Sequence, residues 1–226
     1  KILLLTSSQQ ELLKYFAILF MVIDHIGFMF YPEHIEFRYI GRLAYPTFAF
    51  LIIYNYIYNT SNKEKYLYRI FFFALISEPF HYYFVEEIFL TNLYFANILF
   101  TLLIGLLIVH FFELKKYILL TITIVLTIII EQYLSYHIFG ILLILSFYIG
   151  FKYNFILGIF LQSIALLFLV GVNGVMIFGF YCLLFLPFLF IVSKIKLPKI
   201  KRVKGIYFYI FYPLHMLILK LIKVVN

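Results

Sequence analysis

Apolar residues dominate this chain in long stretches separated by short polar segments. A helix needs about 20 mostly apolar residues to cross a bilayer, and several stretches approach or reach that length. No ten-residue segment shows the in–out alternation of a barrel strand. The pattern predicts an all-α polytopic membrane protein, a bundle of about nine transmembrane helices. The predicted segments are Leu12–Tyr31, Tyr39–Tyr58, Arg69–Val85, Leu93–Phe112, Tyr117–Ile130, Tyr136–Phe151, Asn154–Gly171, Gly174–Ser193 and Ile206–Lys223.

The charged residues between these segments predict the orientation of the chain. Basic residues mark cytoplasmic loops, and here they fall in alternate loops, on the side that carries Lys1 and Lys14. The other loops carry acidic residues. We therefore expect a cytoplasmic amino terminus and an outer carboxyl terminus, in a bacterial cytoplasmic (inner) membrane. The basic loop residues are Lys63, Lys65, Arg69, Lys115, Lys116, Lys152, Lys194, Lys196, Lys199, Lys201, Arg202 and Lys204, and the acidic ones are Glu33, Glu36, Glu86, Glu87 and Glu131.

Composition supports the membrane interpretation. The chain is 65% hydrophobic and 12% charged, with a mean hydropathy of +1.06, whereas soluble domains are about 45–50% apolar and about 25% charged. The net charge of +8 is then mostly an orientation signal, and nucleic-acid binding is excluded as its meaning. The single cysteine, Cys182, excludes an intrachain disulfide. We expect one transmembrane domain over residues 1–226.

Ionisable and polar side chains recur within the apolar segments. A charge at the bilayer centre costs roughly 2.5–3.5 kcal/mol on insertion scales and usually faces a protein interior or cavity. The predicted orientation places nearly all of these residues at mid-membrane or in its outer half. They predict a polar chamber that opens outward, lined by the first, second, third, fourth and ninth segments. Its candidate residues are Asp24, His25, Arg38, Arg42, Glu78, His81, Asn97, Thr101, Tyr212 and His215.

The spacing of these residues suggests how they pair. Neighbours in a helix lie about 100° apart, so Asp24 and His25 are not expected to face each other. We expect Asp24 to pair with Arg42 or Arg38, because an ion pair best holds a buried carboxylate. His25 would then face the chamber and act as a general base.

Each candidate also has a purely structural interpretation. The Asp24 ion pair would lock two helices together, and His81 and His215 would form interhelical hydrogen bonds. Asn97 and Thr101 would be packing contacts, and Glu78 would cap a helix break at Pro79. The basic run of residues 194–204 has three interpretations: orientation signal, contact with anionic lipids, or binding of a phosphate-bearing cofactor. The histidines lack metal-ligand spacing with a carboxylate, so no metal is expected.

Several blocks together resemble the TraX family, conjugation-system proteins associated with acetylation of the pilin amino terminus. The most specific blocks are Asp-His-Ile-Gly at residues 24–27, Gly-Arg-x-x-x-Pro at 41–46 and Phe-Tyr-Pro-x-His at 211–215. The full set of matches falls in order at 21–27, 38–50, 68–69, 73–79, 97–102 with Gly105, 140–144 and 208–215. The chain departs from the family at Ser135, Tyr136 and His137, where members often carry an acidic residue and a glycine. Its lysine run replaces a Tyr-Asn-Gly-x-Arg-Gly turn ahead of the last helix.

The resemblance implies a reaction class. The family is similar to multispanning acyltransferases, which implies transfer of an acetyl (acyl) group from cytoplasmic acyl-CoA, with acetyl-CoA as the expected donor. The acceptor would be extracytoplasmic, a pilin-type protein amino terminus or a surface glycan. His25 would be the base, with Asp24 and Arg42 fixing the geometry.

The remaining site residues have implied roles too. Arg38, Asn97 or Tyr212 would polarise the thioester carbonyl. His81 and His215 are alternative bases or acyl carriers, and Glu78 and Thr101 complete the lining. A transporter or flippase, and a non-catalytic membrane scaffold, are the alternatives. The sequence leaves the acceptor, the acyl chain length and the oligomeric state open.

Overall fold

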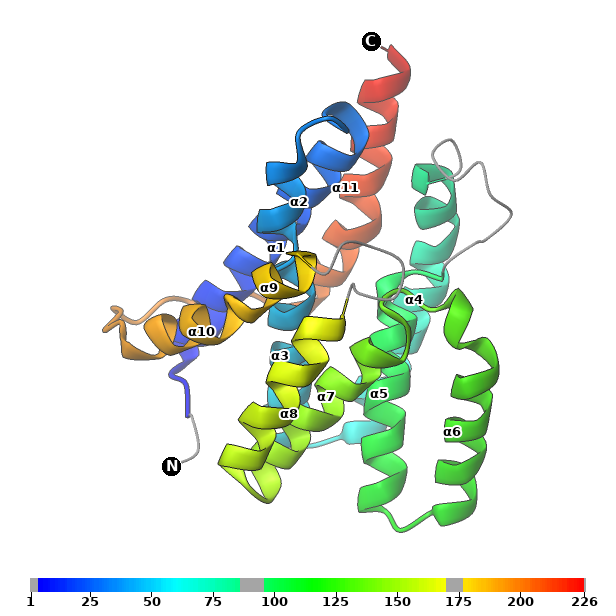
Figure 1. Ribbon diagram of the computed structural model, residues 1–226, viewed down its shortest axis with the longest axis vertical. Helices are drawn as coiled ribbons and strands as arrows, with labels where there is room; N and C mark the ends of the chain where they lie inside the picture. Colours follow the sequence, from blue (N-terminus) through cyan, green and yellow to red (C-terminus); the bar gives the residue numbers. More distant parts are fainter. Residues whose placement is uncertain (1–3, 86–95, 170–176, 226) are drawn as a thin grey trace. The chain divides into compact units, whose positions relative to one another are not determined.

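The computed structural model describes residues 4–85, 96–169 and 177–225, and these residues are almost entirely helical (Figure 1). Within them the only strand-like pairing is an isolated bridge between Ala96 and Leu134. The all-α prediction is therefore confirmed. The elements are α1 Ser7–Phe30, α2 Ile35–Gly41, α3 Ala44–Tyr54, the π-helix Asn55–Asn59, α4 Lys63–Val85, α5 Ile98–Glu113, α6 Tyr117–Ile130, the 3₁₀-helix Glu131–Tyr133, α7 His137–Lys152, α8 Phe155–Phe168, α9 Ile177–Leu183, α10 Phe185–Lys194 and α11 Gly205–Val225.

The helices form two compact units. The terminal unit comprises Lys1–Leu51 and Leu166–Asn226, and the central unit comprises Ile52–Ala165. Helices α1, α2 and α9–α11 belong to the terminal unit, and α4–α7 belong to the central unit.

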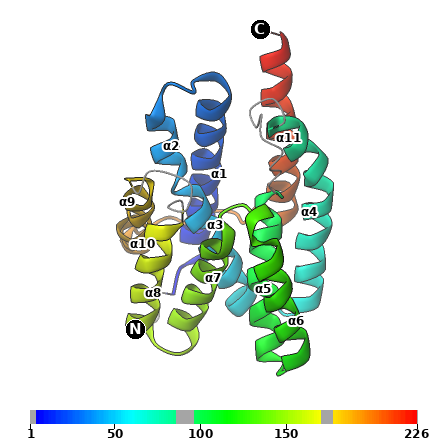
Figure 2. The same ribbon diagram turned by 45° about the vertical axis from the view of Figure 1, so that its right-hand side comes forward.

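In the terminal unit, α1 contacts α2, α10 and α11 (Figure 2). Thr6 begins α1 with a capping box: its hydroxyl accepts from the Gln9 amide, and the Gln9 side chain accepts from the Thr6 amide, which satisfies two groups at the helix start. Two glycines let α1 and α2 approach closely. A Cβ at Gly27 would lie 2.2 Å from the Phe37 Cβ, and one at Gly41 would lie 2.1 Å from the Asp24 Oδ1.

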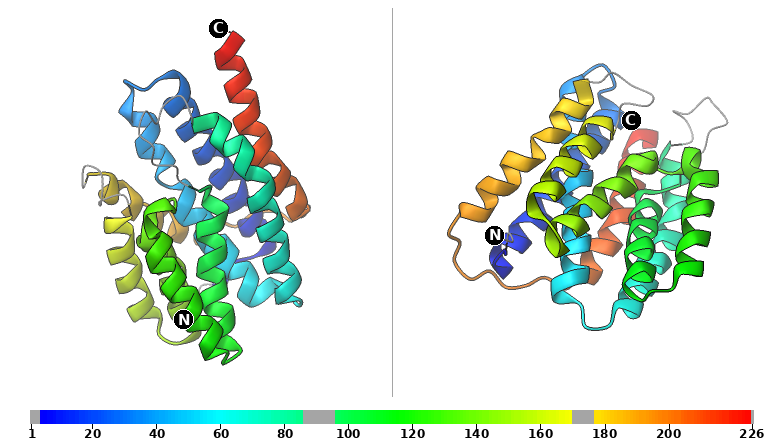
Figure 3. Two further views of the ribbon diagram at one scale, coloured as in Figure 1. Left: turned by 90° about the vertical axis from the view of Figure 1, so that its right-hand side faces the viewer. Right: turned by 60° about the horizontal axis from the view of Figure 1, so that its bottom comes forward.

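In the central unit, α5 contacts α4, α6 and α7 (Figure 3, left). Its start is fixed by Asn97, whose side-chain oxygen accepts from the Leu99 amide as an N-cap. Pro79 lies inside α4, which continues from Lys63 to Val85. The helix break that the sequence suggested at Pro79 is therefore absent from α4.

Two of the described helices, α1 and α11, are long and apolar enough to cross a membrane. In each helix, 33% of the apolar window is buried within the protein, and the other residues are half-buried or exposed. Shorter apolar helices also expose large apolar side chains: in α6, Ile118 is 79% exposed and Ile129 is 64% exposed. Such exposed apolar surface indicates a membrane protein.

Two predicted crossings are divided in the structure. The second segment, Tyr39–Tyr58, contains the end of α2, then α3 and the π-helix. The eighth, Gly174–Ser193, contains α9 and α10. The nine crossings remain a prediction. Leu93, Gly171 and Gly174, where predicted segments begin or end, lie outside the described residues, as do Lys1, Glu86 and Glu87.

Candidate functional site

An ion pair joins α1 to α2 in the terminal unit. Arg38 Nη1 donates to the Asp24 Oδ2 at 2.8 Å and to the Asp24 carbonyl oxygen at 3.4 Å. Of the two arginines that the sequence offered to Asp24, the structure selects Arg38. The missing side chain of Gly41 leaves room for this carboxylate, because any Cβ there would collide with it.

Arg42 is buried, at 8% exposed, and has a different environment. Its guanidinium carbon lies 5.0 Å from the centroid of the Phe178 ring, a cation–π contact. Its Nε has no hydrogen-bond partner, and no ion pair to Arg42 occurs among the described residues. Of the two pairings expected for Asp24, the one with Arg38 forms, which leaves Arg42 as a buried donor.

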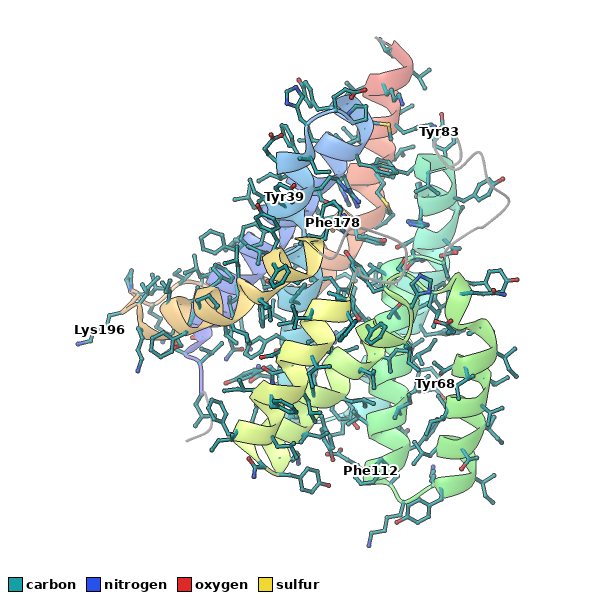
Figure 4. All side chains as sticks on the ribbon, viewed as in Figure 1. Tyr39, Tyr68, Tyr83, Phe112, Phe178 and Lys196 are labelled. Atoms are coloured by element: carbon teal, nitrogen blue, oxygen red, sulfur yellow. The ribbon has the colours of Figure 1, made fainter. Side chains whose placement is uncertain are left out.

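Further aromatic rings pack next to Phe178, the ring that the Arg42 guanidinium contacts. The Tyr39 ring lies 5.6 Å from that of Phe178 and stacks on that of Tyr181 at 4.0 Å (Figure 4). Tyr39 belongs to α2, and Phe178 and Tyr181 belong to α9. These contacts hold Phe178, and with it the face on which the Arg42 guanidinium rests.

A pair of histidines links α1 to α11. The His25 Nδ1 lies 2.7 Å from the His215 Nε2. The ring planes differ by 2° and the centroids are 5.0 Å apart. This separation matches the N–N distance plus the centroid-to-nitrogen distance of each ring, so the rings lie edge to edge in one plane. That is the geometry of an in-line N–H···N hydrogen bond.

The backbone of α11 assigns the tautomers of this pair. The His215 Nδ1 lies 3.0 Å from the Phe211 carbonyl oxygen, which can only accept, so His215 Nδ1 carries the proton. In the neutral ring, His215 Nε2 then accepts, and His25 Nδ1 donates to it. The Nε2 of a neutral His25 is consequently an unprotonated nitrogen, the form required of a general base or nucleophile. The sequence did not predict this pairing.

Aromatic side chains hold the His215 ring. The Phe211 ring lies 5.2 Å from it with an interplanar angle of 5°, and the Tyr212 ring lies 5.9 Å from it. Tyr212 and His215 are both buried. The interhelical interpretation of His215 is confirmed, because it bonds α11 to α1.

In the central unit, Glu78 and Asn97 form a different kind of pair. The Asn97 amide and side-chain nitrogen both donate to the Glu78 carboxylate, and the side-chain nitrogen also donates to the Ala74 carbonyl at 2.8 Å. With the cap to Leu99, both donor hydrogens and an acceptor of the Asn97 side chain are used. Asn97 is 0% exposed. The structural interpretation of Asn97 is therefore confirmed.

Thr101 has a similar structural role. Its hydroxyl donates to the Ser135 carbonyl at 2.7 Å, and the Ser135 hydroxyl donates to the Ala96 carbonyl at 2.7 Å. These bonds hold the start of α5 against the turn before α7. His81 is half-buried near the end of α4, one turn beyond Glu78, and its function remains a prediction.

The ten residues predicted to line one chamber divide between the units. Six belong to the terminal unit: Asp24, His25, Arg38, Arg42, Tyr212 and His215. Four belong to the central unit: Glu78, His81, Asn97 and Thr101. The chamber shared by all ten remains a prediction.

Sequence reasoning missed a charged cluster at the end of α5. Glu113 accepts from Lys63 at 2.5 Å and lies 3.5 Å from the Lys152 Nζ, and the hydroxyls of Tyr56 and Tyr148 donate to it. Burial raises the pKa of the Glu113 carboxyl, but hydrogen bonds and charges from the two lysines outweigh this and leave the pKa below its usual value. Two residues assigned only to orientation are therefore also ion-paired. The one sequence signal for this cluster was Glu113, an acidic residue at the edge of the basic loop that carries Lys115 and Lys116.

These features define an all-helical protein with a tautomer-fixed histidine pair, an arginine-clamped carboxylate and a buried arginine in one unit, and its apolar helices suggest a membrane protein. The TraX protein family matches residues 9–223, nearly the whole chain. The histidine pair, the clamped carboxylate and the buried arginine all lie in the sequence blocks that resemble this family. This chain belongs to the TraX family.

Two curated relatives match parts of the chain. One is the "Uncharacterized protein RP591" of Rickettsia prowazekii (strain Madrid E), 48% identical over 50 residues, which are 22% of this chain and 20% of that protein. The other is the "Probable fimbrial assembly protein FimC, serogroup H1" of Dichelobacter nodosus, 32% identical over 105 residues, 42% of this chain and 43% of that protein. The matches thus cover less than half of either relative. No solved structure matches.

Proposed function

We propose that this protein is a membrane acyltransferase that moves an acetyl or other acyl group from cytoplasmic acyl-CoA to an acceptor on the far side of the membrane. The observation that carries the proposal is the hydrogen-bonded series Phe211 carbonyl, His215, His25. It leaves the Nε2 of a neutral, half-buried His25 unprotonated, beside the buried His215. Membership of the TraX family and the fimbrial-assembly name of one relative favour a pilin-type amino terminus as the acceptor. A surface-glycan hydroxyl is the other acceptor of suitable chemistry.

In the proposed reaction, the acceptor amine attacks the thioester carbonyl while His25 Nε2 removes its proton. A C–N bond forms, the C–S bond breaks, and the proton passes to the leaving sulfur, so that an amide and CoA thiol result. His215 supports the imidazolium that forms on His25, because its Nε2 accepts from His25 Nδ1. With a hydroxyl acceptor, a C–O bond forms instead.

Arg38 and Arg42 have different roles in the proposed reaction. Arg38 fixes Asp24, and so the register of α1 against α2, which sets the position of His25 one residue along. Arg42 keeps an unused donor in a buried setting, where a donor stabilises developing negative charge most strongly. We assign to Arg42 the polarisation of the thioester carbonyl. Asn97 is withdrawn from that role, because Glu78 and Ala74 already use its donors.

The test is acyl transfer by purified protein. Protein in detergent, given labelled acetyl-CoA and a pilin-type amino-terminal peptide or a glycan, is expected to label the acceptor. His25→Ala is expected to lower the rate about 10²–10⁴-fold, the usual contribution of a general base. His34→Ala, an exposed loop histidine, is the matched control and should transfer normally. Transfer by His25→Ala at the wild-type rate, with unchanged thermal unfolding, would disprove the mechanism.

We also propose that the chain crosses a bacterial cytoplasmic membrane several times with its amino terminus inside. The short apolar helices and the alternation of basic loops support this. Since Cys182 is the only cysteine, a Cys182→Ser background permits single-cysteine mapping. A cysteine at Glu36 should react with an impermeant maleimide in intact cells, and one at Lys199 should react only after permeabilisation. The reverse pattern would invert the topology.

A further inference from the structure

The basic segment between α10 and α11 is held in a fixed conformation. Residues 195–204 are not helical, and together with Lys194 they form what we call the basic strap. Figure 3 (right) shows it as the orange segment that joins α10 to α11. It is attached to the first turn of α1 by four consecutive buried polar residues: Ser8, Gln9, Gln10 and Glu11.

The attachments are mostly bonds from α1 side chains to the backbone of the strap. They recur along its whole length, so the strap follows one path across the start of α1. The bonds are Ser8 Oγ to the Pro198 carbonyl (2.9 Å), Gln9 Nε2 to the Ser193 and Ile195 carbonyls (2.9 and 3.0 Å), the Ile200 amide to Ser8 Oγ (3.0 Å), Arg202 Nη2 to Gln10 Oε1 (3.2 Å) and the Val203 amide to Glu11 Oε2 (3.4 Å).

The strap intersperses apolar residues among basic ones. Leu197, Ile200 and Val203 are half-buried, whereas all six basic residues are exposed. Figure 4 shows Lys196 projecting from the end of α10 into open space. The strap therefore presents a row of cations outward. The basic residues are Lys194, Lys196, Lys199, Lys201, Arg202 and Lys204.

Little of this charge is neutralised by the protein. Glu11 lies 3.7 Å from Arg202 and 2.7 Å from Lys14. Across the described ranges, none of the five lysines of the strap forms an ion pair, although Lys194 contacts the Phe190 ring. An orientation signal needs only charge, not a fixed backbone. Four buried polar side chains bind the strap, three of them through its backbone or that of Ser193, which indicates that the arrangement of the cations also matters.

We propose that the basic strap is a docking surface for the phosphate groups of anionic phospholipids in the cytoplasmic leaflet. It leads directly into α11 and crosses the start of α1, the two long apolar helices, so it lies where headgroups lie. Each lysine near an anionic membrane surface adds to the attraction. The row of cations occupies eleven residues of mostly non-helical chain, which suits several headgroups better than one soluble nucleotide. The inference rests on the membrane assignment and not on acyl transfer.

The experiment measures phospholipid affinity. The full chain in a neutral detergent is titrated with dioleoyl phosphatidylglycerol or dioleoyl phosphatidylcholine, and bound lipid is counted by native mass spectrometry. Wild type should prefer phosphatidylglycerol. Lys196→Gln with Lys199→Gln and Lys201→Gln should weaken phosphatidylglycerol binding about 10²-fold. The matched control removes as many charges elsewhere, by glutamine at Lys65, Lys115 and Lys116, and should lose less than about threefold.

A second variant tests the fixed path with the charge unchanged. Ser8→Ala with Gln9→Ala removes three bonds to the strap and one to Ser193 just before it, and should weaken phosphatidylglycerol binding about tenfold. Equal loss in the charge-matched control would overturn the proposal, as would wild-type affinity in the Ser8 and Gln9 variant. Adenosine 3′,5′-bisphosphate tests whether the strap binds the phosphates of a soluble nucleotide instead. If an equimolar amount displaces phosphatidylglycerol from the wild type, the strap is a nucleotide site and the lipid assignment is overturned.

Discussion

The terminal unit and the central unit each place a polar pair within apolar helices, and the two pairs are built differently. Asn97 and Glu78 meet through a network in which Asn97 directs both side-chain donors to protein acceptors and caps α5 with its oxygen. His25 and His215 meet through one in-line bond whose direction is set by the Phe211 carbonyl. In the first network both side-chain donors of Asn97 are used within the fold, while in the second the Nε2 of a neutral His25 is an unprotonated, basic nitrogen.

The difference separates a structural pair from a chemical one. A polar side chain whose donors are satisfied by the fold cannot change partners without breaking it. A relay that ends in an unprotonated nitrogen can take up a proton while its bonds persist. We therefore expect substitutions at Asn97 to act on stability and substitutions at the histidines to act on activity.

The largest effect is expected at Asn97. Asn97→Ala removes the α5 cap and the donors to Ala74 and Glu78, and should lower the free energy of unfolding by about 3 kcal/mol. Unfolding in detergent, followed by helical circular dichroism, measures this. Asn97→Asp keeps a cap acceptor but places a second carboxylate beside Glu78, so it should destabilise at least as much. A loss below about 1 kcal/mol in both variants would contradict the structural assignment.

The next effect concerns His215. His215→Ala removes the acceptor for His25 Nδ1 and should lower kcat/KM for acyl transfer about 10²-fold. Because the two rings act as one unit, the double variant with His25→Ala should be no slower than His25→Ala alone.

The conservative variant His215→Gln distinguishes positioning from packing. Its amide oxygen can accept from His25, so about a tenfold recovery over His215→Ala is expected. The acid limb of the pH–rate profile should also shift between the two variants. Identical rates and pH profiles for alanine and glutamine would show that His215 only fills space.

A smaller effect is expected at Gly41. Its Cβ would lie 2.1 Å from the Asp24 carboxylate, so Gly41→Ala must displace Asp24 or α2 and should cost about 2 kcal/mol. Gly205→Ala is the matched control, since nothing lies within 4 Å of a Cβ there, and thermal unfolding compares the two. Equal stability would mean that α1 and α2 are not packed as closely as described.

The smallest effect should be a gain, at the turn before α7. Tyr136 has φ 64°, in the left-handed region, which costs a non-glycine residue about 1 kcal/mol or more. Tyr136→Gly should therefore raise the free energy of unfolding by about 1 kcal/mol. Tyr133→Gly, in the neighbouring 3₁₀-helix where φ is not positive, should lower it. A loss at Tyr136 would indicate that its side chain matters more than its backbone.

Sequence reasoning found the polar residues of the site more readily than their partners. It placed Asp24 beside an arginine, because a buried carboxylate needs a counter-charge, but offered both Arg38 and Arg42. It put His25 into an open chamber and did not pair it with His215, 190 residues away in the chain. It identified the basic run but not the four polar residues that hold it. Spacing within one helix identifies neighbours three or four residues apart, whereas these contacts join separate elements.

The amino-acid sequence by itself determined the all-helical fold and the family, and it predicted the membrane character. These follow from apolar stretches, basic loops and short motifs, which are local properties of the chain. Only the tertiary structure decided that Arg38 clamps Asp24, that Arg42 stays without an ion pair in the described part, and that His215 orients His25. Those outcomes depend on how α1, α2 and α11 pack, and packing depends on side chains that meet across long separations in sequence.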